Sequence, residues 1–231
     1  MLSVQGVNQY YGESHTLWDV ELDVPEGSCT CLMGRNGVGK TTLLKSVMGT
    51  LKVASGKIAL GGVDLSSAPP WERARAGIGL VPQGRDIFPL LTVEENLLTG
   101  FAAAKRRKRQ IPARIFELFP VLKEMLTRRG GDLSGGQQQQ LAIARALISE
   151  PKLLILDEPN EGIQPNIVRQ IGDVLLRLNE EEKLTILLVE QKLPFARRVG
   201  KRFCVMDRGR IVATGAMSEL SDEIVNRHLV V

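Results

Sequence analysis

The feature that most constrains the fold is a glycine-rich segment at residues 34–41, G-R-N-G-V-G-K-T, which matches the pattern G-x-x-x-x-G-K-T. A short apolar run at residues 28–33 precedes it, and residues 40–48 after it have the composition of a helix. Such a strand, loop and helix bind the phosphates of a nucleotide, because backbone N–H groups of the loop and of the helix N-terminus point at the anion. A glycine-rich turn with an accidental lysine is the alternative, which the flanking strand and helix disfavour.

Each fixed residue of this segment has an expected role. The three glycines allow a tight turn and a close approach of backbone to phosphate. Lys40 is expected to place its charge on the β- and γ-phosphates, and the hydroxyl of Thr41 to ligate Mg²⁺. The predicted nucleotide-binding residues here are Gly34, Arg35, Asn36, Gly37, Val38, Gly39, Lys40, Thr41 and Thr42.

A second segment, L-L-I-L at residues 153–156, is continuously apolar, as a parallel strand buried on both faces should be. It ends in Asp157 and Glu158. Ligand-binding groups in open α/β sheets gather at the carboxyl ends of strands, so Asp157 is expected to hold Mg²⁺ and Glu158 to polarise the water that attacks the γ-phosphate. A solvated acidic turn after a strand is the alternative when this segment is considered alone.

The third segment is L-S-G-G-Q at residues 133–137, before a predicted helix over residues 137–149. Ser134, Gly135, Gly136 and Gln137 thereby lie at a helix N-terminus, a second anion site. Lys40 is already expected to bind the γ-phosphate of one nucleotide. A second γ-phosphate-binding element therefore indicates a partner subunit that contacts the nucleotide from the other side. The alternative is an ordinary helix start, for which Ser134 is a good N-cap.

These motifs, in this order, resemble those of ATP-binding cassette ATPases, and the resemblance covers essentially the whole chain. It implies an α/β fold: a P-loop NTPase core with an antiparallel β subdomain and an inserted helical subdomain. It also implies that two cassettes enclose two ATP molecules, each between the P-loop of one subunit and the Ser134 motif of the other. Tyr11 matches the aromatic residue that stacks on adenine, and Gln83 the glutamine that contacts Mg²⁺. By spacing alone, Tyr11 would be a packing residue and Gln83 a plain loop residue.

The order of apolar and turn segments agrees with this organisation. The first part of the chain is rich in predicted strands, including a hairpin across Gly61 and Gly62, and residues 85–149 carry mostly helical signals. We therefore expect one domain over residues 1–231, with a nucleotide-binding core at 1–84 and 150–231 and a helical subdomain at 85–149.

Finer similarities narrow the family. Residues 130–143 and 157–165 are similar to importer cassettes of the branched-chain amino acid and amide group, and residues 81–88 and 161–165 are most similar to cassettes of bacterial urea importers. The resemblance implies the ATP-hydrolysing subunit of an importer, with urea as the expected solute and branched-chain amino acids or short amides as the alternative. It also implies a second cassette, identical or related, two membrane permease subunits and an extracytoplasmic solute-binding protein. It places the docking site of a permease loop near residues 83–96, with Arg85, Phe88 and Leu91 as candidate contact residues. An equally weighted alternative is that Phe88 and Leu91 pack in the core of the helical subdomain.

Three positions depart from the general cassette pattern. Gln191 stands where most cassettes carry a histidine, as it does in branched-chain importer cassettes, and its amide can donate to a γ-phosphate oxygen but cannot carry a proton charge. Gln164 replaces an aspartate, and Asn160 replaces a threonine or serine. The expected catalytic residues are thus Glu158, Lys40 and Gln191, and the expected metal ligands are Thr41, Gln83 and Asp157.

Composition bounds the remaining possibilities. The 231 residues carry a net charge of +4, concentrated in the basic run 105–109, for which a solvated loop, contact with anionic lipid and a nucleic-acid groove are alternatives in that order. No apolar run is long enough to span a bilayer and no signal layout is evident, so we expect a cytoplasmic protein that is soluble by itself. The resemblance to importer cassettes implies a peripheral position at the cytoplasmic face of the membrane. The three cysteines have no zinc spacing and fit a reducing compartment.

Two other functions compete with transport. One is an ATPase switch acting on ribosomes or nucleic acid; such proteins often fuse two cassettes or insert long arms, and this chain shows neither, so we expect no nucleic-acid partner. The other is a nucleotide-binding regulator without hydrolysis, against which Glu158 argues and for which Gln191 and Gln164 argue weakly.

Overall fold

A computed structural model describes residues 1–104 and 110–229. Its larger sheet has the strand order β10-β9-β3-β8-β7-β6, parallel except for the antiparallel pair β9–β10. The strands are β3 (Cys29–Met33), β6 (Ile78–Val81), β7 (Leu153–Asp157), β8 (Thr185–Val189), β9 (Arg202–Asp207) and β10 (Arg210–Ala216). Every residue of β3, β7 and β8 is buried, as the continuous apolar run at residues 153–156 predicts for β7.

The smaller sheet is antiparallel, with the order β2-β1-β4-β5. Its strands are β1 (Leu2–Tyr11), β2 (Ser14–Val24), β4 (Ser55–Leu60) and β5 (Val63–Asp64). The predicted hairpin at Gly61 and Gly62 is confirmed: both glycines have positive φ, 57° and 83°, as a two-residue hairpin turn requires.

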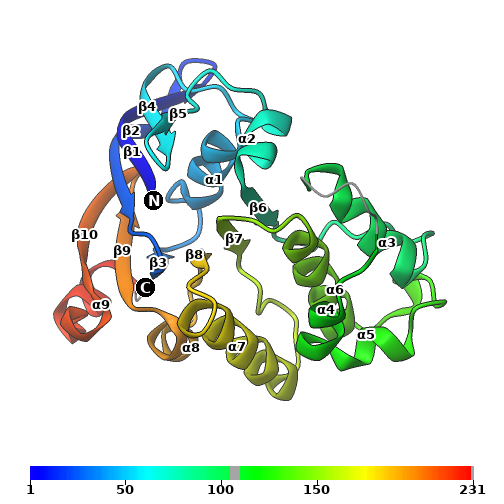
Figure 1. Ribbon diagram of the computed structural model, residues 1–231. Coiled ribbons are helices and arrows are strands. Elements are labelled where there is room, and N and C mark those ends of the chain that lie inside the picture. Colours follow the sequence, from blue (N-terminus) through cyan, green and yellow to red (C-terminus); the bar gives the residue numbers. More distant parts are fainter. Residues whose placement is uncertain (105–109, 230–231) are drawn as a thin grey trace.

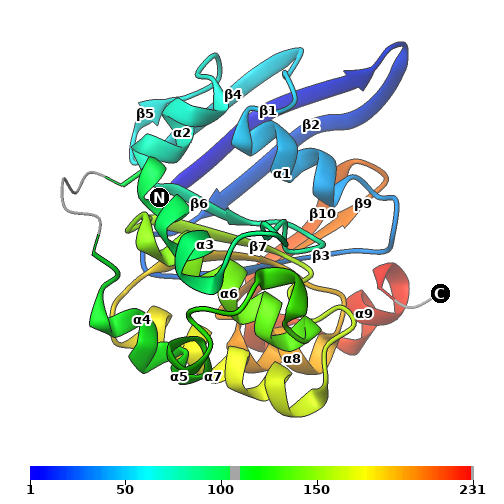
Figure 2. The same cartoon turned by 90° about the vertical axis from the view of Figure 1, so that its right-hand side faces the viewer.

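Helices cover both faces of the larger sheet (Figure 1). Helix α1 (Lys40–Met48) packs between the two sheets, where Leu43 and Val47 share a core with residues of β1, β2 and β7. The opposite core contains Leu154 and Leu156, whereas their neighbours Leu153 and Ile155 face α1. Figure 2 shows the resulting layers: the antiparallel sheet, α1, the larger sheet, and a second layer of helices. The expected α/β cassette fold with an antiparallel sheet is confirmed.

The remaining helices are α2 (Pro70–Ala76), α3 (Val93–Thr99), α4 (Ala113–Leu118), α5 (Pro120–Glu124), α6 (Gly135–Ile148), α7 (Pro165–Glu180), α8 (Leu193–Val199) and α9 (Asp222–His228). Helices α3 to α6 lie together beyond β6 and β7 (Figure 1), in the segment predicted to be an inserted subdomain. The exact division at residues 85 and 149 stays a prediction, and the basic run 105–109 lies outside the described residues. None of the described helices is long and apolar enough to cross a bilayer.

Asn96, on α3, fixes the loop that follows β6. Its side chain is fully buried; Oδ1 accepts from the backbone N–H of Phe88 at 2.8 Å, and Nδ2 donates to the carbonyl oxygens of Phe88, Leu91 and Thr92. One buried amide side chain thus satisfies several backbone groups at the end of the loop that carries Gln83.

We expect Asn96→Ala to lower the free energy of unfolding by about 3 kcal/mol, because it leaves buried donors and acceptors without partners. Urea denaturation measures this change. Glu94→Ala, at an exposed position of the same helix, serves as the control and should move the midpoint little. Equal midpoints for the two variants would contradict the role given to Asn96.

Candidate functional site

The loop between β3 and α1 has the conformation that the glycine motif predicts. Gly34 and Gly39 have φ values of 152° and 113°, in the region that side chains disfavour. A Cβ atom on Gly34 would lie 2.4 Å from the carbonyl oxygen of Met206, so the neighbouring chain leaves no room for a side chain. The backbone N–H groups that follow lead directly into the N-terminus of α1, which favours negative charge.

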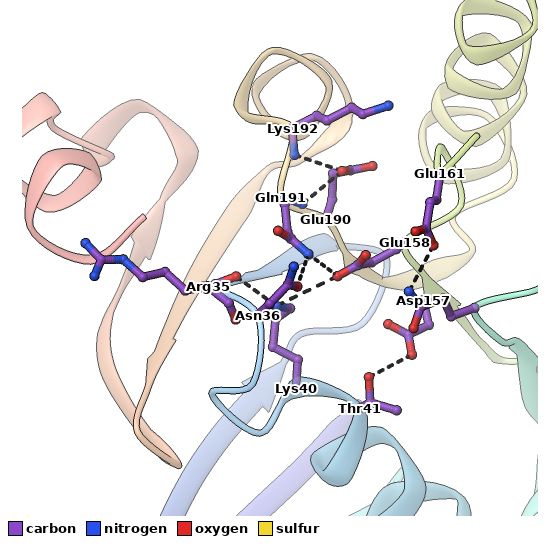
Figure 3. A network of polar contacts seen from close by, with 12 residues as sticks. Arg35, Asn36, Lys40, Thr41, Asp157, Glu158, Glu161, Glu190, Gln191 and Lys192 are labelled. Atoms are coloured by element: carbon purple, nitrogen blue, oxygen red, sulfur yellow. Dashed lines mark hydrogen bonds and ion pairs between the residues drawn. The ribbon is translucent and has the colours of Figure 1, made fainter. Parts of the chain in front are cut away.

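Lys40 lies at the centre of this loop. Its side chain is only 5% exposed, and Nζ donates to the carbonyl oxygens of Gly34 and Arg35, each at 2.8 Å. The carboxylate of Glu158 lies 3.8 Å away (Figure 3). Burial lowers the pKa of Lys40, while Glu158 and Asp157 oppose that shift. The ammonium is thus held by two neutral carbonyls and lies in the field of two carboxylates, of which Glu158 is within ion-pair distance.

Asp157 and Thr41 face each other across the same site. The Thr41 hydroxyl donates to Oδ2 of Asp157 at 3.3 Å, and Oδ1 of Asp157 is buried without a hydrogen-bond partner among the described residues. Burial and, secondarily, the charge of Glu158 raise the pKa of Asp157. A carboxylate oxygen and a hydroxyl that converge beside a phosphate site fit Mg²⁺, which takes a few protein oxygens and completes its shell with phosphate and water. Within the described ranges no cluster of three or more metal-binding side chains competes with this site.

Glu158 and Gln191 come from the ends of neighbouring parallel strands. The backbone N–H of Glu158, whose φ is 48°, donates to the carbonyl of Val189 at 2.9 Å. Nε2 of Gln191 donates to the carboxylate of Glu158 and, at 2.6 Å, to Oδ1 of Asn36 in the P-loop. Gln191 therefore connects the acidic strand with the phosphate loop, at the place where the sequence expects it (Figure 3).

The P-loop, Glu158 and Gln83 line one pocket of about 250 Å³. Gln83 is exposed there, and its Nε2 donates to Oε2 of Glu161 at 2.9 Å. Thr16, on β2, also lines the pocket and was not predicted, because nothing in its sequence surroundings marks it. The full lining is Thr16, Asn36, Gly37, Gly39, Lys40, Thr41, Thr42, Gln83 and Glu158.

Of the predicted residues, Asp157 and Gln191 lie outside this lining but contact Thr41 and Glu158 within it, and Gly34, Arg35 and Val38 belong to the same loop. Tyr11 and the Ser134 motif do not line the pocket in the described chain. Tyr11 is 48% exposed at the end of β1 and is not part of the core. Ser134 is the N-cap of α6: its hydroxyl accepts from the N–H of Gln137 at 3.4 Å, and its own N–H donates to Oε1 of Gln137 at 2.9 Å. The capping interpretation of Ser134 is confirmed, and its use as an anion site stays a prediction.

Glu190 is a buried residue of the site that the sequence prediction missed. It is 3% exposed; Oε1 accepts from the backbone N–H groups of Gln191 and Lys192 at 2.8 Å, and Oε2 from Nδ2 of Asn160 at 2.6 Å. Burial raises its pKa, and these hydrogen bonds partly offset the rise. The available signal was a carboxylate placed directly after a fully buried strand that is apolar except for Thr185.

The comparisons with known proteins agree with this geometry. The family model described as ABC transporter matches residues 17–161, which is more than half of the chain. The branched-chain amino acid transport ATP-binding protein BraG of Pseudomonas aeruginosa is 44% identical over 219 residues, covering 94% of each chain. The probable branched-chain amino acid transport ATP-binding protein LivF of Archaeoglobus fulgidus is 40% identical, covering 95% of this chain and 94% of its own.

Among solved structures, the dimeric ATP-binding cassette MJ0796, bound to ADP and Pi in a post-hydrolysis state, superposes with a TM-score of 0.85 at 26% identity, covering 94% of this chain and 99% of its own. That structure shows the same architecture around a bound nucleotide. With the motif order, the phosphate loop and the acidic strand end in place, the chain belongs to the ABC transporter family as one of its ATP-binding, ATPase subunits.

Proposed function

We propose that this chain binds ATP with Mg²⁺ at the P-loop and hydrolyses it to drive a membrane importer, with branched-chain amino acids as the first solute class to test. The observation that carries the proposal is the 44% identity to BraG over nearly the whole of both chains, together with the pocket that contains Lys40, Thr41, Gln83 and Glu158.

The proposed chemistry follows from positions and charges. Lys40 and the loop N–H groups bind and orient the β- and γ-phosphates. Thr41, Asp157 and Gln83 would hold Mg²⁺, which neutralises charge on the phosphate oxygens. Glu158 accepts a hydrogen bond from the attacking water and orients it toward the γ-phosphate. Gln191, already in contact with the carboxylate of Glu158, holds that carboxylate in place, and its second N–H would turn from Asn36 to the phosphate.

The assembly is proposed on the same grounds. The motif of Ser134, Gly135, Gly136 and Gln137 closes on the nucleotide of a second cassette, and Tyr11, half exposed at its strand end, stacks on adenine. A cytoplasmic loop of one of the two permease subunits docks near Arg85, Phe88 and Leu91 at the cytoplasmic face of the membrane, and an extracytoplasmic protein delivers the solute. Phe88 supports this role because it is 48% exposed, with Arg145 over its ring at 5.4 Å.

Two different observations bear on the identity of the transported solute. The names of BraG and LivF favour branched-chain amino acids. The similarity of residues 81–88 and 161–165 to urea importer cassettes keeps urea as a second candidate.

Uptake by the cell that encodes the chain separates these possibilities. We expect deletion of the chain to abolish its high-affinity uptake of labelled leucine, and the wild-type chain, but not Glu158→Gln, to restore it. Loss of labelled urea uptake instead would select urea. Unchanged uptake of both solutes would contradict an importer for this group of solutes.

A further inference from the structure

Two loops that leave neighbouring strands meet beside the proposed hydrolysis site. One follows β7 and carries Glu158 and Asn160; the other follows β8 and carries Glu190 and Gln191. The strands are parallel, and Asp157 pairs with Val189 in their register. Both loops therefore start at the same edge of the sheet.

A buried contact joins the loops. Asn160 and Glu190 are 1% and 3% exposed, and Nδ2 of Asn160 donates to Oε2 of Glu190 at 2.6 Å. A second bond runs alongside, from Nζ of Lys192 to the carbonyl oxygen of Asn160 at 3.0 Å. A hydrogen bond to a buried carboxylate is stronger than one between neutral groups, so this contact strongly restrains the distance between the loops.

The other oxygen of Glu190 acts on the backbone. Oε1 accepts from the N–H groups of both Gln191 and Lys192, each at 2.8 Å. These two bonds fix the backbone of Gln191 and therefore the direction of its side chain. That side chain donates to Glu158 and to Asn36 (Figure 3). Glu190 thus touches neither the P-loop nor Glu158 through the bonds described; its bonds lead to them through Gln191 and through Asn160, which lies in the loop of Glu158.

We propose that Glu190 is a positioning residue for hydrolysis: through its contact with Asn160 it holds the peptide of Gln191 so that the Gln191 amide is aligned with Glu158. The proposal rests on the proposed ATPase function. Loss of this contact should misplace Gln191 without removing any group that binds ATP at the P-loop.

An exchange of donor and acceptor tests the contact. Asn160→Asp places two carboxylates face to face at a distance of 2.6 Å, which disfavours the charged pair. Adding Glu190→Gln restores the bond in reverse, because the amide nitrogen introduced at position 190 donates to the carboxylate introduced at position 160, while the amide Oε1 still accepts from the two N–H groups. Glu190→Gln alone should be mild, since Oδ1 of Asn160, buried and without a partner in the described chain, can accept after an amide flip.

Steady-state ATP hydrolysis by the purified chain is the first measurement. We expect Asn160→Asp and Glu190→Ala to lower kcat about tenfold or more, with KM for ATP nearly unchanged, because a small misplacement of a reacting group has effects of this size. The double variant should recover most of the kcat, and the exposed control Glu180→Ala should stay near wild type. A double variant no better than Asn160→Asp, or a loss expressed mainly in KM, would overturn the proposal.

Amide exchange provides a readout that does not depend on turnover. The N–H groups of Gln191 and Lys192 should exchange faster in Glu190→Ala and Asn160→Asp, and return toward wild-type protection in the double variant. Unchanged protection in both single variants would also overturn the proposal. A wild-type chain that neither binds nor hydrolyses ATP would refute the proposed function instead. Amide hydrogen exchange would still decide whether the contact between Asn160 and Glu190 holds the backbone of Gln191.

Discussion

Glu158→Gln is expected to lower the rate of ATP hydrolysis by about 10³-fold, because general-base and water-orienting groups contribute about 10²–10⁴-fold to such reactions. The replacement keeps the size of the side chain, and its carbonyl oxygen can still accept from Nε2 of Gln191. An amide cannot take up a proton from water at neutral pH, so the chemical step is lost while the shape of the site is kept. Phosphate release at saturating MgATP measures the change.

The same variant should still bind ATP and should accumulate as an ATP-bound dimer, since none of the N–H groups of the P-loop and neither Lys40 nor Ser134 is altered. Size-exclusion chromatography with and without ATP reports the dimer. Glu117→Gln, the same chemical change at an exposed position of α4, is the matched control and should hydrolyse at the wild-type rate. Hydrolysis by Glu158→Gln within a few-fold of wild type would show that another group activates the water.

Much of the fold could be predicted because local patterns and tertiary structure agree. The runs 28–33, 153–156 and 184–189 are apolar without interruption, or nearly so, and each becomes a strand buried on both faces. Gly61 and Gly62 predict a hairpin and Ser134 a helix start; the structure has both. These signals depend on neighbours in sequence, which is why they can be read from a single chain.

The contacts that assemble the site could be predicted less well. The motif assigns Lys40, Thr41 and Asp157 individually, because each has a fixed place relative to a strand end or helix start. The bonds from Gln191 to Asn36 and from Asn160 to Glu190 join segments 155 and 30 positions apart, and only the strand order brings them together. Glutamine, asparagine and glutamate are common in solvated loops, so composition gives no reason to expect Asn160 and Glu190 to be buried.

Tyr11 is a second residue whose burial could not be predicted from the sequence. Spacing alone makes it a packing residue, but the structure leaves it 48% exposed. Tyr11 is the last residue of β1 and pairs with Ser14, the first residue of β2, beside the connecting turn and away from the core. A role in stacking on adenine therefore rests on family resemblance and on this exposure.

Lys40→Ala is expected to weaken ATP binding about 100-fold or more, which corresponds to about 2.7 kcal/mol or more. The lysine supplies the positive charge nearest to the β- and γ-phosphates, and its Nζ also bridges the carbonyl oxygens of Gly34 and Arg35. Its loss removes a charge-assisted contact with the ligand and leaves Glu158 and Asp157 without the cation that faces them, so the site becomes more repulsive to a triphosphate.

Calorimetric titration with MgATP on the Glu158→Gln background measures this affinity without turnover. Lys45→Ala is the matched control: it removes the same charge from an exposed position of the same helix, and it should change the affinity only by the weak, screened field of a surface charge. If both variants lost affinity equally, net charge near α1 would govern binding. If neither did, the triphosphate would bind elsewhere. A large loss confined to Lys40→Ala is the result that only a phosphate cradle at residues 34–41 explains, because a general electrostatic effect does not distinguish two lysines of one short helix.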